Sequence, residues 1–125
     1  GPWLGEPLAA SAISWVTSLS ASVLPERQAY PDLYDALKAV LDAICHAPSA
    51  RGWLAALVTY ETLMLRDLGY GGGKAPQFAD FEEAFAAFDR LFTPIEKHLL
   101  AGTFGDVMSA RTLLRTRLSK IVEAE

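Results

Sequence analysis

The segment of residues 50–68 would be apolar on nearly every side if it formed a helix. Its apolar side chains do not fall on one narrow stripe, and they are Trp53, Leu54, Leu57, Val58, Leu63, Met64, Leu65 and Leu68. A helix of this kind is stable only when other elements surround it. The segment therefore predicts the central helix of a bundle. Gly69, which follows it, can close the last turn in the left-handed conformation.

Four further helical segments lie between proline and glycine residues. Two of them, at about 7–23 and 31–47, carry apolar residues at spacings of three and four. A third begins after Asp80, which precedes Glu83 by three residues as in a capping box, and it is interrupted at Pro94 before continuing to about residue 100. The last begins at Asp106. Because no segment alternates as a strand does, we predict an all-α fold.

We expect a single compact bundle of about five helices over residues 6–125, with a flexible glycine-rich loop at 69–77. Residues 1–5 are interpreted as a leader or a tag remnant, because Gly1 and Pro2 resemble the scar that a protease leaves when it removes a tag.

Composition excludes several classes of function. The net charge is −4 and the isoelectric point is about 5.1, so bulk charge does not favour a polyanionic partner. The single cysteine, Cys45, excludes an internal disulfide and a zinc site built on several thiolates. No run of apolar residues is long enough to span a membrane, and no signal peptide is recognised. We expect a cytoplasmic protein.

No catalytic, cofactor-binding or metal-binding residue is predicted. The glycines before Lys74 lack the spacing and the following Ser or Thr of a phosphate-binding loop. His46 and His98 lie in different predicted helices, and a pair with Cys45 would require the fold to bring them together. We therefore do not expect an enzyme.

Five phenylalanines recur at helical spacing, at positions 78, 81, 85, 88 and 92. A stripe of this kind usually forms the core of a bundle. The alternative is a groove or an exposed face that accepts the apolar side chains of a partner.

The last helical segment carries the densest group of positive charges, namely Arg111, Arg115, Arg117 and Lys120. Cations near the end of a helix complement the helix dipole, which is one interpretation. The other is an anchor for the phosphates of DNA or for an acidic peptide.

Several stretches together resemble the helical C-terminal part of RecO, a bacterial family of recombinational repair mediators, in its alphaproteobacterial form. They occur in family order along most of residues 7–122, and they are 24–27 (LPER), 30–37 (YPDLYDAL), 53–58 (WLAALV) with Tyr60 and Glu61, 68–71 (LGYG), 95–100 (IEKHLL), and 110–111 (AR) with Leu113 and Leu114.

The resemblance implies a non-enzymatic DNA repair and recombination domain that binds protein partners. The expected partners are the acidic tail of single-strand DNA-binding protein and RecR. Direct DNA binding is doubtful without the N-terminal OB-fold, which makes much of that contact in this family and is not recognised in this sequence. The residues expected at the tail site are Arg111, Arg115, Tyr60, Phe85, Phe88 and Phe92, with the arginines receiving carboxylates and the rings forming an apolar pocket.

The chain departs from the family pattern in three respects, of which the first is that no OB-fold is recognised in the sequence. The cysteine-bearing zinc segment expected after Gly71 is missing, and Thr59 stands where many relatives carry arginine. These departures leave an alternative open, in which the chain is an engineered or trimmed scaffold derived from a RecO helical domain. Such a scaffold would retain no native activity and could carry a redesigned contact face.

Overall fold

Helices account for most of the residues that this computed structural model describes, which are 7–24, 30–71, 74, 76–102 and 105–124. The long helices are α1 (Pro7–Val23), α2 (Pro31–His46), α3 (Leu54–Asp67), α4 (Phe81–Arg90) and α6 (Asp106–Glu123). Three shorter pieces join them, namely η3 (Ala50–Gly52), α5 (Phe92–Pro94) and η4 (Ile95–Leu99). The described residues include no strand, which confirms the all-α prediction. Residues 1–5, predicted to be a leader or tag remnant, lie outside the described residues.

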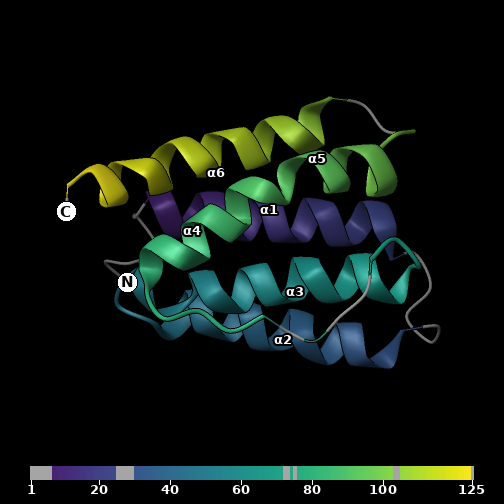
Figure 1. The fold of residues 1–125 in the computed structure, drawn as a ribbon, viewed down its shortest axis with the longest axis horizontal. Helices are drawn as coiled ribbons and strands as arrows, with labels where there is room; N and C mark the ends of the chain where they lie inside the picture. The colour runs from purple at the N-terminus through teal and green to yellow at the C-terminus, as the bar shows by residue number, and fades with distance from the viewer. Residues whose placement is uncertain (1–6, 25–29, 72–73, 75, 103–104, 125) are drawn as a thin grey trace.

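The helix α3 lies inside the bundle, as its apolar circumference predicted. It packs between α2 and α4 (Figure 1), and it also contacts α1 through buried side chains. Its buried residues are Leu54, Leu57, Val58, Tyr60, Glu61, Met64 and Leu65. The first and last helices, α1 and α6, lie against each other in opposite directions. Within the described part of the chain, no helix has the length and apolar content needed to cross a bilayer.

Gly69 ends α3 as predicted. Its φ angle is +93°, in the left-handed region that residues with a Cβ atom rarely adopt. The amide of Gly69 donates to the carbonyl of Arg66 (3.0 Å), and the amide of Tyr70 donates to the carbonyl of Leu65 (2.8 Å). These two bonds form a Schellman motif, which satisfies carbonyls that the helix end would otherwise leave unpaired.

We expect Gly69→Ala to lower the free energy of unfolding by about 1–2 kcal/mol, because alanine is strained at this φ angle. Gly71→Ala is the matched control, since no atom lies within 4 Å of an added Cβ there and its φ angle is not in the left-handed region. Urea denaturation of both variants measures the difference. Equal midpoints would contradict the role assigned to the left-handed turn.

The chain crosses the bundle between α3 and α4, so that the two helices run in the same direction (Figure 1). The predicted capping box is present in part at the start of α4, because the Glu83 side chain accepts from the residue before the N-cap and not from the N-cap itself. The Asp80 side chain accepts from the amide of Glu83 (2.9 Å), and the Glu83 side chain accepts from the amide of Ala79 (3.1 Å). Residues 72, 73 and 75 of the predicted flexible loop lie outside the described residues.

The interruption predicted at Pro94 falls at Leu91 instead, between α4 and α5. Pro94 has no amide hydrogen to donate to the carbonyl of Arg90, which is consistent with a break at this point. The short α5 ends at Pro94, and η4 continues as a single π-helical turn in which the amide of Leu100 donates to the carbonyl of Ile95 (3.1 Å).

The phenylalanine stripe lies mainly on the core side of α4. Phe81 and Phe88 are buried, whereas Phe78, Phe85 and Phe92 are half-buried and pack against the core. The stripe is therefore largely explained by packing within the bundle, and only its half-buried members remain accessible to a partner.

Candidate partner-binding site

A buried ion pair joins α3 to α6. The Nη2 atom of Arg111 donates to Oε1 of Glu61 (2.9 Å), and its Nε atom donates to Oε2 of the same carboxylate (3.2 Å). The two side chains are 1% and 0% exposed. Buried charges of opposite sign require further polar partners, because their removal from water is costly.

Two more helices supply those partners. The indole Nε1 of Trp15, in α1, donates to Oε2 of Glu61 (2.7 Å), and Nη2 of Arg111 donates to the carbonyl of Phe88, in α4 (2.6 Å). The Arg111 guanidinium also lies over the Phe88 ring, 3.8 Å from its centroid. Four helices thus meet at one polar cluster, which we name the Glu61 cluster: Trp15, Glu61, Phe88 and Arg111.

Tyr60 is buried beside this cluster. Its hydroxyl shares a hydrogen bond of 2.6 Å with Ser20, whose hydroxyl donates to the carbonyl of Val16 (2.7 Å). Burial raises the pKa of the Tyr60 phenol above its ordinary value, and the bond to Ser20 lowers it by less. Tyr60 therefore ties α3 to α1 as a neutral side chain.

Three of the residues expected to bind a partner are consequently inside the fold. Tyr60, Phe88 and Arg111 are fully buried. The Arg111 guanidinium is 1% exposed and pairs with the Glu61 carboxylate, so the structure does not present it at the surface to a carboxylate from outside. The hypothesis that Arg111 receives the acidic tail does not fit this position, and its role in the structure is to pair with Glu61.

Arg115, one turn after Arg111, lies at the surface. Its Nε and Nη2 atoms donate to the two carboxylate oxygens of Asp89 in α4, at 3.0 and 3.1 Å. Both side chains are 45% exposed. The guanidinium also lies 5.4 Å from the centroid of the half-buried Phe85 ring. We name these three residues the α4–α6 rim: Phe85, Asp89 and Arg115.

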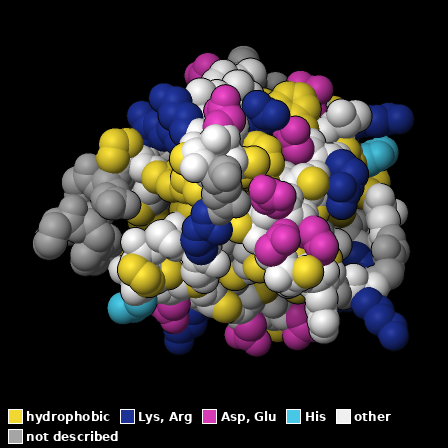
Figure 2. All heavy atoms as spheres, turned by 60° about the vertical axis from the view of Figure 1, so that its left-hand side comes forward, with side chains coloured by type: hydrophobic (Ala, Val, Ile, Leu, Met, Phe, Trp, Pro, Cys, Tyr) yellow, Lys and Arg dark blue, Asp and Glu magenta, His cyan; other side chains and the backbone are white. Residues whose placement is uncertain are grey.

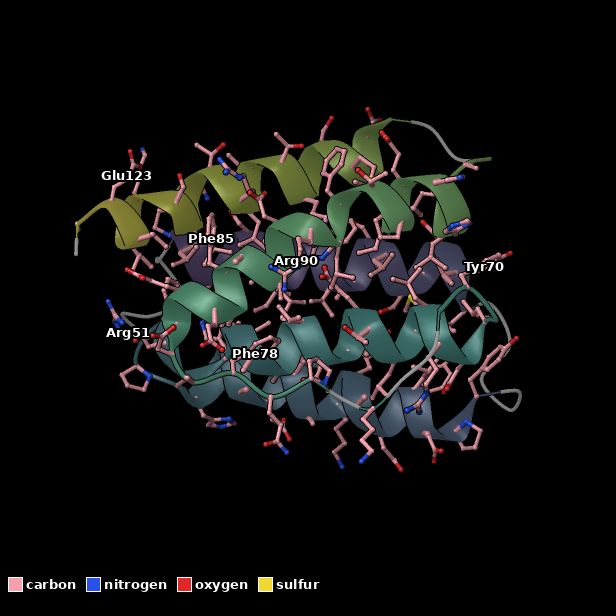
Figure 3. All side chains as sticks on the ribbon, viewed as in Figure 1. Arg51, Tyr70, Phe78, Phe85, Arg90 and Glu123 are labelled. Carbon is pink, nitrogen blue, oxygen red and sulfur yellow. The ribbon has the colours of Figure 1, made fainter. Side chains whose placement is uncertain are left out.

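Figure 3 shows Phe85 at the edge of α4 next to α6. Phe92, the remaining predicted residue, is half-buried in α5, two helical turns after Phe85. Of the six residues predicted at the site, the structure thus brings Phe85 and Arg115 together at the surface. It places Tyr60, Phe88 and Arg111 in the core.

Arg111 and Arg115 were predicted to lie near the phenylalanine stripe, but the contact of Arg51 with that stripe was not predicted. Arg51, from η3, lies 5.2 Å from the Phe81 ring centroid, so that three rings of the stripe each have an arginine nearby. The cluster partners Trp15 and Glu61 were also missed. A signal was present, because Glu61 and Arg111 are charged residues at positions where the helical pattern calls for apolar ones.

The surface charge is mixed. Acidic and basic side chains are interspersed on the face shown in Figure 2, with hydrophobic side chains between them. This face has no continuous basic area of the kind that holds a nucleic-acid backbone.

His98 lies far from the neighbouring residues Cys45 and His46. Cys45 and His46 line a cavity of about 240 Å³ near the start of α3, and the His46 Nδ1 atom lies 2.8 Å from the carbonyl of Asp42. His98 instead stacks on Tyr70 beyond the other end of α3, with ring centroids 4.8 Å apart. Among the described residues, no three His, Cys, Asp or Glu side chains are grouped so that they could hold a metal ion.

Comparison with known proteins finds matches to the N-terminal half of the chain. Residues 4–72 match the family model described as "Recombination protein O C terminal". This match covers α1, α2 and α3 and ends among the glycines after Tyr70. The helices α4 and α6, which carry the α4–α6 rim, lie beyond it.

Three similar proteins are each described as DNA repair protein RecO. The relative from Caulobacter sp. (strain K31) is 42% identical over 66 residues, which are 53% of this chain and 26% of the relative. The relative from Dinoroseobacter shibae is 41% identical over 68 residues, 54% of this chain and 27% of the relative. The relative from Rhizobium etli is 41% identical over 64 residues, which are 50% of this chain and 24% of the relative.

The matched region thus spans about a quarter of the length of these curated relatives. No solved structure gives a significant match to the chain. The family model covers 69 of the 125 residues, which is more than half of the chain. The chain therefore belongs to the RecO C-terminal family.

Proposed function

We propose that this chain is a non-enzymatic domain of DNA repair by recombination, and that it acts by binding other proteins in the cytoplasm. Membership of the RecO C-terminal family supports this proposal, as do the relatives described as DNA repair proteins. The accessible Arg115 guanidinium and the half-buried Phe85 ring beside it are side chains suited to contact with a protein.

The partner that we propose is the acidic tail of single-strand DNA-binding protein, and the site is the α4–α6 rim with Phe92. One observation supports this placement above the others. The accessible Arg115 guanidinium lies beside the half-buried Phe85 ring, so that a carboxylate and an apolar side chain of one peptide could be held together. RecR is proposed as a second partner from the resemblance alone.

A peptide titration tests the proposal. A labelled peptide with several aspartates and a C-terminal phenylalanine is added to the chain at low salt, and its anisotropy gives the dissociation constant. We expect Arg115→Gln to weaken binding about tenfold, because a charge-assisted hydrogen bond is lost. Arg90→Gln is the control, since it removes an equal charge from an exposed position of α4 outside the rim.

Two results would contradict the site. The first is an equal effect of Arg115→Gln and Arg90→Gln on the dissociation constant, which would show that only the net charge of the chain affects binding. The second is that the chain is folded but does not bind the peptide at low salt. If the chain also does not bind single-stranded DNA, the result favours the alternative of a scaffold without native activity.

A further inference from the structure

We propose that Asp89 is an internal competitor for the acidic peptide, and that it occupies Arg115 until a ligand with several carboxylates displaces it. This inference rests on the proposed function, because it concerns the regulation of the same site. It starts from the pair that Arg115 forms with Asp89 across the α4–α6 rim.

Asp89 presents the same chemical group that the peptide would bring. Its two oxygens accept from Nε and Nη2 of Arg115, at 3.0 and 3.1 Å, which is the bidentate geometry preferred between a guanidinium and a carboxylate. The hydrogen bond and the charge of Arg115 hold the pKa of Asp89 below its ordinary value. The Asp89 carboxylate is therefore charged at neutral pH, where it competes with the carboxylates of the peptide for Arg115.

An incoming carboxylate has two ways to approach Arg115, and Asp89 opposes both. On the Nε edge, the ligand must replace the two bonds that Asp89 makes. On the Nη1 edge, the ligand can bind without displacing Asp89, but its negative charge then lies close to the Asp89 carboxylate. Glu123, near the end of α6, adds a further negative charge that acts on Arg115.

The effect of Asp89 on the binding equilibrium is small enough for a peptide to overcome. Both side chains of the pair are about half exposed, and ion pairs of this kind change an equilibrium by about fivefold at most. A single carboxylate with no other contact gains little by replacing Asp89. A peptide that adds further charges and places an apolar side chain on Phe85 gains more than it loses, so Asp89 selects for that combination.

Four chains test the inference: the unmodified chain, Asp89→Asn, Arg115→Gln and the double variant. The same labelled peptide is titrated into each. We expect Asp89→Asn to bind about fivefold more tightly than the unmodified chain, and we expect this gain to disappear in the double variant. Asp35→Asn on α2 is the matched control, because it makes the same chemical change at an exposed position on a helix at the opposite side of the bundle from α6 (Figure 1).

The outcomes separate this inference from the proposed function. If the unmodified chain binds and Asp89→Asn binds equally or more weakly, Asp89 does not compete and instead positions Arg115, and the inference is overturned while the function stands. If Asp35→Asn produces the same gain, net charge explains it and the inference is again overturned. If neither the unmodified chain nor Asp89→Asn binds the peptide, the proposed function fails and the inference fails with it.

Discussion

Replacement of Arg111 by alanine is expected to lower the free energy of unfolding by about 3–5 kcal/mol. The substitution leaves the Glu61 carboxylate inside the bundle, where the side chain is 0% exposed, with the Trp15 indole as its remaining side-chain hydrogen-bond donor. An unpaired buried charge is far more costly than the loss of one ordinary contact. Urea denaturation followed by circular dichroism measures the change.

Two further variants isolate the charge from the packing. The double variant Glu61→Leu with Arg111→Met replaces both charges by apolar groups, and we expect it to recover most of the lost stability. Arg115→Ala removes an arginine of the same helix whose ion pair is exposed, and we expect a loss below about 1 kcal/mol. Equal losses for Arg111→Ala and Arg115→Ala would show that the buried pair does not form.

Replacement of Phe88 by alanine should cost about 3–5 kcal/mol, which is the range for removing a large aromatic side chain from a core. The Phe88 side chain is 0% exposed, and its ring lies under the Arg111 guanidinium. The substitution therefore creates a cavity and also removes a cation–π contact. Thermal and urea denaturation of the variant give the magnitude.

Phe85→Ala is the control for Phe88, because Phe85 belongs to the same stripe but is only half-buried. We expect Phe85→Ala to lower stability by clearly less than Phe88→Ala and to weaken binding of the acidic peptide. If the two variants lost the same stability, the distinction between a core ring and a rim ring would be wrong.

Local chemistry made much of the fold predictable from the sequence. The apolar circumference of residues 50–68 placed α3 inside the bundle, and Gly69 marked its end because a left-handed residue closes the Schellman motif. Asp80 and Glu83 marked the start of α4, and Pro94 indicated a break that the structure places at Leu91. Each of these signals acts over one helical turn, so the neighbouring residues alone contain it.

The Glu61 cluster could not be predicted in the same way. Glu61 and Arg111 are 50 residues apart, and their pairing depends on how α3 and α6 pack. The basic residues of the last helix suggested a single surface group, yet one turn separates the buried Arg111 from the exposed Arg115. Which side of α6 faces the core decides between the two, and that orientation is a property of the whole bundle.

The Glu61 cluster also determines what can be separated from this chain. Glu61 and Trp15 lie within residues 4–72, whereas Arg111 and Phe88 lie beyond that segment. A fragment truncated after residue 72 would lose Arg111, which pairs with Glu61, and would expose the faces of α1 and α3 that α6 and α4 cover, so we expect it to be less stable than the whole chain. We expect a different sequence joined after the glycines to pack best on α3 if it places a positive group against Glu61, which limits how this half of the chain can be exchanged.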